Sequence, residues 1–202
     1  GEKLFVPNTL VIFEKAKPSS GAAAPQNKDY PVAPIRRYKA IIFDAGEVLL
    51  HSDYSPAARK FAAYSQKTEA EIIAAMKKSE ARKLSTVGAI GNADFIAAMK
   101  KELALEGVSD REFTMIFNSI YTPWPQMIGL ARKLKASGFK VAVLSNITRL
   151  RQDYLLKSLP LSGEIDGFFT SCQLGLAKPD PRSYLFALDK LGVSSQETIF
   201  ID

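Results

Sequence analysis

Three short apolar runs stand out along the chain, and each ends at polar residues. The runs and their polar ends are 40–43 with Asp44, 140–144 with Ser145 and Asn146, and 198–201 with Asp202. A continuous apolar run of this length favours a strand that is buried on both faces, as in a parallel sheet. Ligands of open α/β sheets bind beyond the carboxyl ends of the strands. The pattern therefore predicts a parallel sheet with these polar residues along one edge.

Helical patterns fill residues 53–122, between the first two of these strands. Thr68 with Glu71, and Ser109 with Glu112, have the spacing of a capping box at the start of a helix. Behind these caps, apolar residues recur every three or four positions, as on one face of a helix. The segment is much longer than a crossover between two strands needs. We expect it to form a small all-helical cap domain over the carboxyl edge of the sheet.

Helices are also predicted for the rest of the chain after the cap. One spans residues 125–137, with Leu130 among the side chains that face inward, and a second spans 148–159. A third begins at Asp180-Pro181 and ends at Gly192, because proline favours the first turn of a helix and glycine favours its end.

The first 36 residues differ in composition from the rest. Residues 1–17 contain one apolar run, which predicts a short strand or the tail of an upstream domain. Residues 18–36 are rich in proline, alanine and serine, which is typical of a linker. We therefore expect the core to comprise 37–52 and 123–202, with an upstream domain of the same polypeptide as a candidate partner.

Composition and charge narrow the functional classes. The 202 residues carry a net charge of +6, and the basic residues are scattered along the chain, which favours small anionic substrates over nucleic acid. No apolar stretch reaches the ~18 residues of a membrane span, and no secretory signal pattern begins the sequence. The single cysteine, Cys172, excludes an intramolecular disulfide. We expect a cytoplasmic protein without a nucleic-acid or membrane partner.

Four motifs coincide with the strand ends and with the start of the last helix. They are Phe43-Asp44-Ala45-Gly46-Glu47-Val48-Leu49, Leu144-Ser145-Asn146, Lys178-Pro179-Asp180-Pro181 and Ile199-Phe200-Ile201-Asp202. In this order, they resemble the motifs of the haloacid dehalogenase-like hydrolases, in the phosphatase-like branch with a helical cap after the first strand. The resemblance covers about residues 37–202. It implies a doubly wound, Rossmann-like α/β fold with an inserted helical cap.

The resemblance also implies roles for individual residues. Asp44 corresponds to the nucleophile, Ser145 to the hydroxyl that binds the phosphoryl group, and Lys178 to the lysine that offsets negative charge. Asn146 is expected to orient groups around the substrate. From the residues alone, a helix-capping aspartate, a loop serine and a solvated lysine remain open for the first three.

The resemblance further implies a Mg²⁺ cofactor, since this hard cation prefers oxygen ligands. Its ligands would be the Asp44 carboxylate, the Gly46 carbonyl and Asp202. In the Phe-Ile-Asp-Asp form of the last motif, the metal ligand is more often the second acid, and this sequence stops at the first. The last strand and helices of the family core are therefore expected to be missing from it.

Gly46 is a departure that bears on the mechanism. Phosphatases of the family generally have a second aspartate at this position, which serves as the general acid and base. The neighbouring Glu47 is a weak substitute, because its side chain should point to the other side of the strand end. His51 and Trp124 flank the cap, and we expect them to pack at its hinge.

These features predict Mg²⁺-dependent hydrolysis of a small phosphomonoester through an aspartyl-phosphate on Asp44. One alternative is a non-catalytic or regulatory domain of a larger protein, which Gly46 and the linker favour. A second alternative is a haloacid dehalogenase, which also uses an aspartate nucleophile but needs no metal. The sequence does not identify the substrate or the oligomeric state.

Overall fold

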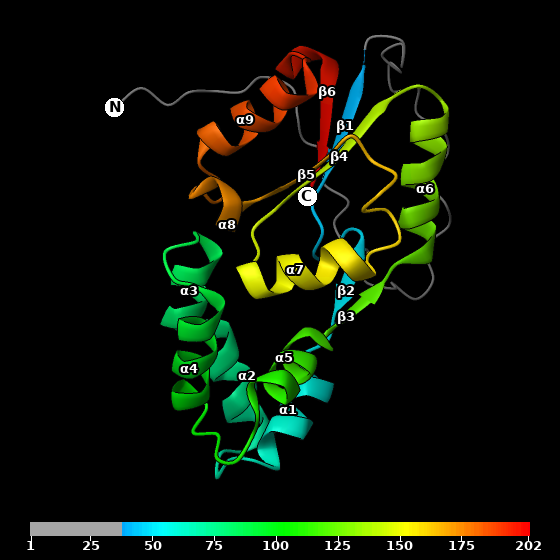
Figure 1. Ribbon diagram of the computed structural model, residues 1–202. Coiled ribbons are helices and arrows are strands. Elements are labelled where there is room, and N and C mark those ends of the chain that lie inside the picture. The colour runs from blue at the N-terminus through cyan, green and yellow to red at the C-terminus, as the bar shows by residue number, and fades with distance from the viewer. Residues whose placement is uncertain (1–37) are drawn as a thin grey trace, which may run out of the picture.

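The computed structural model describes residues 38–202, so the predictions for residues 1–17 and 18–36 lie outside the described part of the chain. Its centre is a sheet of four parallel strands in the order β5-β4-β1-β6 (Figure 1). The strands are β1 Ala40–Phe43, β4 Lys140–Ser145, β5 Gly167–Thr170 and β6 Thr198–Ile201. The three predicted strands are thus confirmed, and β5 is an addition to them.

The register of β1 brings the predicted polar residues together. Phe43, the last residue of β1, pairs with Val143 on one side and with Ile201 on the other. The polar residues that follow these positions therefore leave the sheet at the same edge. The backbone N–H of Asp44 continues the ladder by donating to the carbonyl of Ile201 at 2.7 Å.

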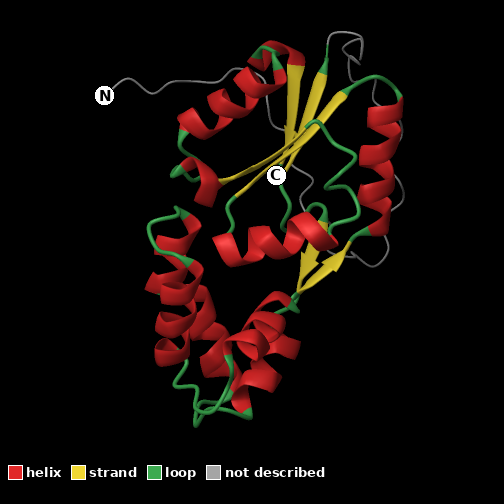
Figure 2. Cartoon of the chain, in the orientation of Figure 1, coloured by secondary structure: helices red, strands yellow, loops and turns green. Residues whose placement is uncertain are grey.

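Helices cover both faces of the sheet (Figure 2). On one face, α6 (Pro125–Ala136) and α7 (Arg149–Ser158) pack against alternate side chains of β1 and β4, which form one apolar core. On the other face, α9 (Pro181–Leu191) packs against the intervening side chains, and the short α8 (Ser171–Leu174) lies next to β5. This arrangement confirms the predicted α/β class with a parallel sheet.

One detail of the core helices follows from local sequence, and another does not. Asp180 accepts a hydrogen bond from the backbone of Arg182 and caps α9, which ends at Gly192 with φ 63°, as predicted. In α6, however, the prediction that Leu130 faces inward is wrong, because its side chain is 38% exposed. Ile128 and Ala131 are buried instead. Other apolar residues lie on either side of Ile128 and Ala131 on the helix surface. The spacing of apolar residues alone therefore did not determine which of them meets the sheet.

Five helices lie between β2 and β3, and we call them the helical insertion. They are α1 Ser55–Ala62, α2 Glu69–Lys78, α3 Glu80–Thr86, α4 Asn92–Glu102 and α5 Asp110–Asn118. The capping box of Thr68 and Glu71 is present at the start of α2. Ser109 caps α5, but the Glu112 carboxylate accepts a hydrogen bond from the Tyr64 hydroxyl at 2.5 Å instead of closing a capping box.

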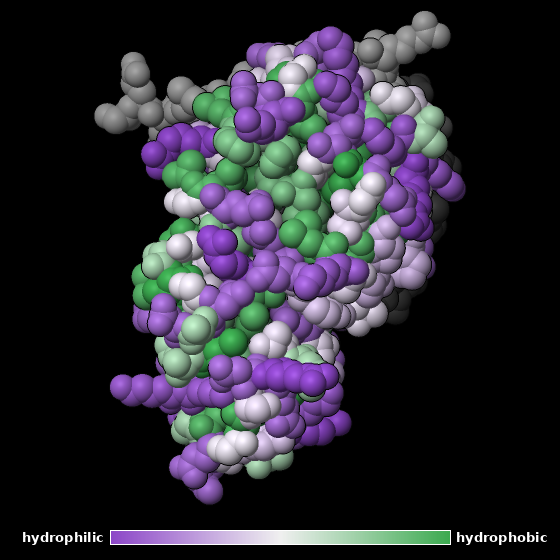
Figure 3. All heavy atoms as spheres, in the orientation of Figure 1, coloured by the Kyte–Doolittle hydropathy of each residue, from purple (hydrophilic) through white to green (hydrophobic). Residues whose placement is uncertain are grey.

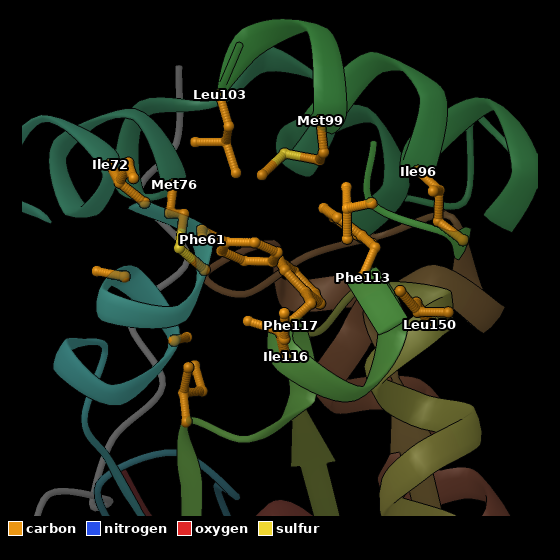
Figure 4. Close-up of a cluster of buried hydrophobic side chains, with 14 of the residues drawn as sticks. Phe61, Ile72, Met76, Ile96, Met99, Leu103, Phe113, Ile116, Phe117 and Leu150 are labelled. Carbon is orange, nitrogen blue, oxygen red and sulfur yellow. The ribbon is translucent and has the colours of Figure 1, made fainter. Parts of the chain in front are cut away.

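The helical insertion has an apolar core of its own (Figure 4). Phe61, Phe113 and Phe117 are fully buried at its centre, with ring centroids 5.3 Å apart for Phe61 and Phe113 and 5.6 Å apart for Phe113 and Phe117. Leu150 of α7 also belongs to this cluster. One helix of the sheet domain therefore packs directly against the insertion.

A two-stranded antiparallel ribbon joins the insertion to the sheet. It consists of β2 (Leu50–Ser52) and β3 (Tyr121–Pro123), and sequence analysis did not predict it. The ribbon places the insertion beyond the carboxyl ends of the central strands (Figure 1). This is the side of the sheet at which Asp44 emerges.

The surface is mixed in character. On the face drawn in Figure 3, hydrophilic side chains are interspersed with apolar ones. Among residues 38–202, no helix is both long enough and apolar enough to cross a membrane.

Candidate active site

Asp44 stands at the centre of the predicted edge, directly after β1. Its Oδ1 accepts a hydrogen bond from the backbone N–H of Ala45 at 2.7 Å, which fixes the carboxylate next to the strand end. The side chain keeps 17% of its surface exposed. Asp44 is therefore held in place while part of its surface stays open to a ligand.

Lys178 bridges Asp44 and Asp202. Its Nζ lies 3.2 Å from Asp44 Oδ1 and 3.0 Å from Asp202 Oδ2, although the two acids follow different strands. The lysine side chain is only 7% exposed, and its ammonium lies 5.0 Å from the ring centroid of Phe200. Three of the residues proposed from sequence thus converge, with Lys178 in direct contact with both acids.

Asn146 fixes the loop that carries Lys178. Its Nδ2 donates to the carbonyl of Lys178 at 2.8 Å, and its Oδ1 accepts from the backbone N–H of the same residue at 2.8 Å. Both polar atoms of the amide thus bind the backbone of one residue. In the structure, Asn146 thus positions the loop of Lys178, and its expected role around the substrate stays a prediction.

Several groups act on the pKa of Asp44, and the net effect raises it above its ordinary value. Burial is the largest cause, because it disfavours the charged carboxylate. The Lys178 ammonium and a hydrogen bond with the Ser145 hydroxyl oppose this effect, while the negative charge of Asp202 adds to it. Ser145 is the last residue of β4 and is 2% exposed. A carboxylate with a raised pKa is more basic and hence a better nucleophile.

The oxygen atoms at this edge suit a small hard cation. The Asp44 and Asp202 carboxylates share Lys178, and Asp202 is close enough to raise the pKa of Asp44. A Cβ built on Gly46 would lie 4.0 Å from Asp44 Oδ2, so the Gly46 backbone borders the same carboxylate. Proteins usually bind Mg²⁺ through one or two carboxylates, completed by water and substrate phosphate. The donor set fits this pattern.

The same donor set fits metals of other classes less well. Within residues 38–202, no three or more His, Cys, Asp and Glu side chains gather into a metal-binding group. A cation at this edge would therefore depend on two side chains, one backbone carbonyl and exogenous oxygen ligands.

Residues at the hinge do not contribute to this cluster. The Glu47 carboxylate accepts from the backbone N–H of Ser52 at 2.9 Å and lies 3.4 Å from His51 Nδ1, so it faces the ribbon. His51 itself is largely exposed on β2. The backbone N–H of Trp124 donates to Leu49 at 2.8 Å and ties the start of α6 to the loop after Gly46.

Two residues near the site were missed by sequence analysis. Arg151 of α7 is 4% exposed, and its Nη1 donates to the Tyr121 hydroxyl at 3.0 Å. The pKa of Tyr121 is raised, mainly by burial, and the charge of Asp44 contributes to this shift. The sequence did contain a signal that Arg151 is buried. Arg151 lies four residues before Leu155 on a predicted helix, and residues four apart share a face of a helix.

The family model for haloacid dehalogenase-like hydrolases matches residues 38–202. Among curated proteins, the chain is similar to (S)-2-haloacid dehalogenase 4A of Burkholderia cepacia, with 37% identity over 78 residues, or 39% of this chain and 34% of that protein. It is also similar to a glyceraldehyde 3-phosphate phosphatase of Methanocaldococcus jannaschii, with 28% identity over 83 residues, 41% of this chain and 36% of that protein. These matches span about a third of each relative's length.

Solved structures support the same fold over more of the chain. A HAD family enzyme of Bacteroides thetaiotaomicron, in complex with magnesium and inorganic phosphate, aligns with a TM-score of 0.70 at 20% identity. The alignment covers 81% of this chain and 83% of that one. A dehalogenase structure aligns with a TM-score of 0.58 at 26% identity, covering 82% of this chain and 76% of that one. A HAD family enzyme and a dehalogenase thus share this architecture.

Proposed function

Since the chain belongs to the haloacid dehalogenase-like hydrolases, we propose that it hydrolyses a small phosphomonoester with Mg²⁺, using Asp44 as the nucleophile. The observation that carries the proposal is the convergence of Asp44 and Asp202 on the Lys178 ammonium, at 3.2 and 3.0 Å. Two carboxylates and one cation at the end of a parallel sheet suit the transfer of a phosphoryl group, in which negative charge must be offset.

The reaction would proceed in two displacements. An Asp44 oxygen attacks phosphorus, the bond from phosphorus to the ester oxygen breaks, and the leaving alkoxide takes a proton to depart as an alcohol. Water then attacks phosphorus in the aspartyl-phosphate, which releases inorganic phosphate and restores the Asp44 carboxylate. Because Gly46 has no carboxyl group, both proton transfers would involve solvent.

Residues of this chain would assist each displacement. The Lys178 ammonium offsets charge on Asp44 and on the transferring group, and its burial strengthens that effect. The Ser145 hydroxyl, which lies close enough to Asp44 to lower its pKa, can turn to a phosphoryl oxygen. Asp44, Asp202 and the Gly46 carbonyl would hold Mg²⁺, which when bound polarises phosphoryl oxygens. The helical insertion would act as a cap that selects the substrate.

Turnover of p-nitrophenyl phosphate in the presence of Mg²⁺ tests this proposal. We expect hydrolysis by the wild type, loss of activity in Asp44→Asn, and retention in Asp189→Asn, a matched control on an exposed face of α9. Acid-quenched protein should carry a phosphoryl adduct that is absent from Asp44→Asn. Activity that survives in Asp44→Asn, or its absence from the wild type at every Mg²⁺ concentration, would contradict the proposal.

Gly46 favours dehalogenation of a small haloacid as a second candidate function. A halide leaves as a stable anion and needs no proton, so the absence of an acid at position 46 does not slow dehalogenation. An Asp44 oxygen would attack the halogen-bearing carbon, the carbon–halogen bond would break, and water would hydrolyse the resulting ester. Release of chloride from 2-chloropropionate without metal, in place of phosphate ester hydrolysis, would establish this candidate over the first.

A further inference from the structure

Arg151 is held between the sheet domain and the helical insertion by aromatic rings. Its guanidinium carbon lies 4.3 Å from the ring centroid of Phe117, 5.0 Å from that of Tyr121 and 5.8 Å from that of Tyr54. Phe117 comes from α5, Tyr121 from β3, and Tyr54 from the residue before α1. Rings from the insertion and its hinge thus fix a cation that belongs to α7 of the sheet domain.

Two donor nitrogens of this cation have no partner. Arg151 is 4% exposed, and neither its Nε nor its Nη2 has a hydrogen-bond acceptor, whereas its Nη1 donates to Tyr121. Among the buried side-chain atoms without a partner in residues 38–202, these are the only ones on a charged group. Arginine cannot lose its proton in proteins, and buried donors without acceptors cost free energy. The arrangement leaves two donors available to an acceptor that is not part of the chain.

A cavity of about 350 Å³ is lined in part by Arg151. Arg82 and Lys83 of α3 line it from the insertion, and Asn146 and Arg151 line it from the sheet domain. Its walls contain three cationic side chains and no acidic one. Thr148 also lines it, so the N-terminal end of α7, with its partial positive charge, opens on the same space. Every charge along this wall favours an anion.

Two chains of contacts connect the cavity to the nucleophile. Asn146, in its wall, binds the backbone of Lys178, whose ammonium contacts Asp44. Tyr121, which accepts from Arg151, is close enough to Asp44 for that charge to affect its pKa. Arg151 and Asp44 therefore belong to one network of neighbouring residues.

We propose that Arg151 binds a second anionic group of the substrate, so that the preferred substrate is a compact phosphomonoester that also carries a carboxylate. This inference rests on the proposed phosphomonoester hydrolysis for the role of Asp44. A planar guanidinium with two free N–H groups matches the two oxygens of a carboxylate. The volume of the cavity is near the lower limit for ligand sites, which favours a small molecule.

Binding to a protein that cannot turn over tests the inference directly. Calorimetric titration of Asp44→Asn with 3-phosphoglycerate and with glycerol 3-phosphate, both with Mg²⁺, compares a carboxylate with the corresponding alcohol. We expect 3-phosphoglycerate to bind about 10- to 100-fold more tightly, the range for charge-assisted hydrogen bonds. In the double variant Asp44→Asn with Arg151→Met, this ratio should fall to near 1, since methionine keeps the stem and removes the charge.

Two comparisons separate recognition from a structural role. Arg149→Met, on an exposed position of the same helix, should leave the ratio unchanged. Thermal unfolding of Arg151→Met is measured in parallel, because the variant also loses the hydrogen bond to Tyr121 and the contacts with the aromatic rings. If that variant does not fold, Arg151→Lys provides the test, and its ratio should be smaller than that of the wild type but above 1.

The outcomes also distinguish this inference from the proposed function. Equal affinity for the two ligands, no binding of 3-phosphoglycerate, or a preference that survives Arg151→Met would overturn the role of Arg151, even if the wild type hydrolyses phosphate esters. A preference that depends on Arg151 supports that role, even if the wild type hydrolyses neither ligand. In that case only the proposed function would fail.

Discussion

Replacing Gly46 with aspartate is expected to accelerate phosphomonoester hydrolysis, because it places a proton donor beside the nucleophile. The site has room for the new side chain. A Cβ at position 46 would lie 4.0 Å from Asp44 Oδ2, with no other atom inside that distance. The Gly46 backbone also lies outside the left-handed region that only glycine adopts readily, so the substitution is not strained.

The size of the gain follows from two opposing effects. General acid catalysis typically contributes a factor of about 10² to 10⁴ in rate. Against this, two carboxylates about 5 Å apart repel each other by roughly 3 kcal/mol at an effective dielectric constant near 20. The repulsion raises the pKa of the pair, which keeps the new carboxyl protonated and able to act as an acid. Because no neighbouring group is arranged to orient that carboxyl, we expect the lower limit, about 10²-fold.

The assay compares kcat/KM for glycerol 3-phosphate and for p-nitrophenyl phosphate. The alkoxide of glycerol needs a proton to leave, whereas p-nitrophenolate is a stable anion, so the gain in Gly46→Asp should be confined mainly to glycerol 3-phosphate. Gly46→Asn is the matched control, because it has the same shape without the acid. Our reasoning would be refuted if the asparagine variant gained as much as the aspartate variant, or if both substrates gained equally.

Three further predictions concern stability and reactivity. Phe113→Ala should lower the free energy of unfolding by about 3–5 kcal/mol, since the ring is fully buried between two others. Met115→Ala, on the exposed side of α5, should change it by less than about 0.5 kcal/mol. Urea unfolding measures both variants, and similar values for the two would contradict the packing argument. Hydrogen bonds with Lys39 and Ser194 lower the pKa of Glu197 to about 2, so its contribution should be complete above pH 4.5 and lost between pH 4.5 and 2. Thermal unfolding of Glu197→Gln should therefore show a deficit at pH 7 that closes over this range, and a deficit that persists at pH 2 would count against the ion pair. Burial raises the pKa of the Cys172 thiol, so a thiol reagent should label it slowly in native protein and quickly in urea; fast native labelling would show that the thiol is accessible.

The sequence predicted the strands that consist mainly of continuous apolar runs and missed those whose signal is local or weak. In β1, all four residues are buried, so hydrophobicity alone identifies the strand. By contrast, β5 has only two apolar residues, Phe168 and Phe169, and both are partly exposed at the edge of the sheet. The strands of the ribbon are three residues long, too short for any periodic pattern, and their pairing depends on the position of the insertion.

For the candidate site, motifs identified the residues at strand ends but not those contributed by packing. Asp44 and Asp202 could be placed together because parallel strands end at one edge. Arg151 was missed although it lies four residues before Leu155, because a charged residue in a basic helix is usually solvated, and the aromatic rings of three distant segments bury it. The role of Asn146 as a support for Lys178 likewise depends on a contact across 32 residues of chain.

The ribbon of β2 and β3 has a consequence for how this enzyme family can vary. Ser52 and Tyr121 are paired neighbours, so the chain leaves the sheet domain and returns to it at nearly the same point. Any segment whose ends lie equally close could be spliced between these two residues without moving Asp44 or Lys178, because insertion at adjacent points disturbs a domain least. The helical insertion is in this sense an exchangeable module. A chimera that carries another helical module between Ser52 and Tyr121 should keep the nucleophile and acquire a new substrate preference.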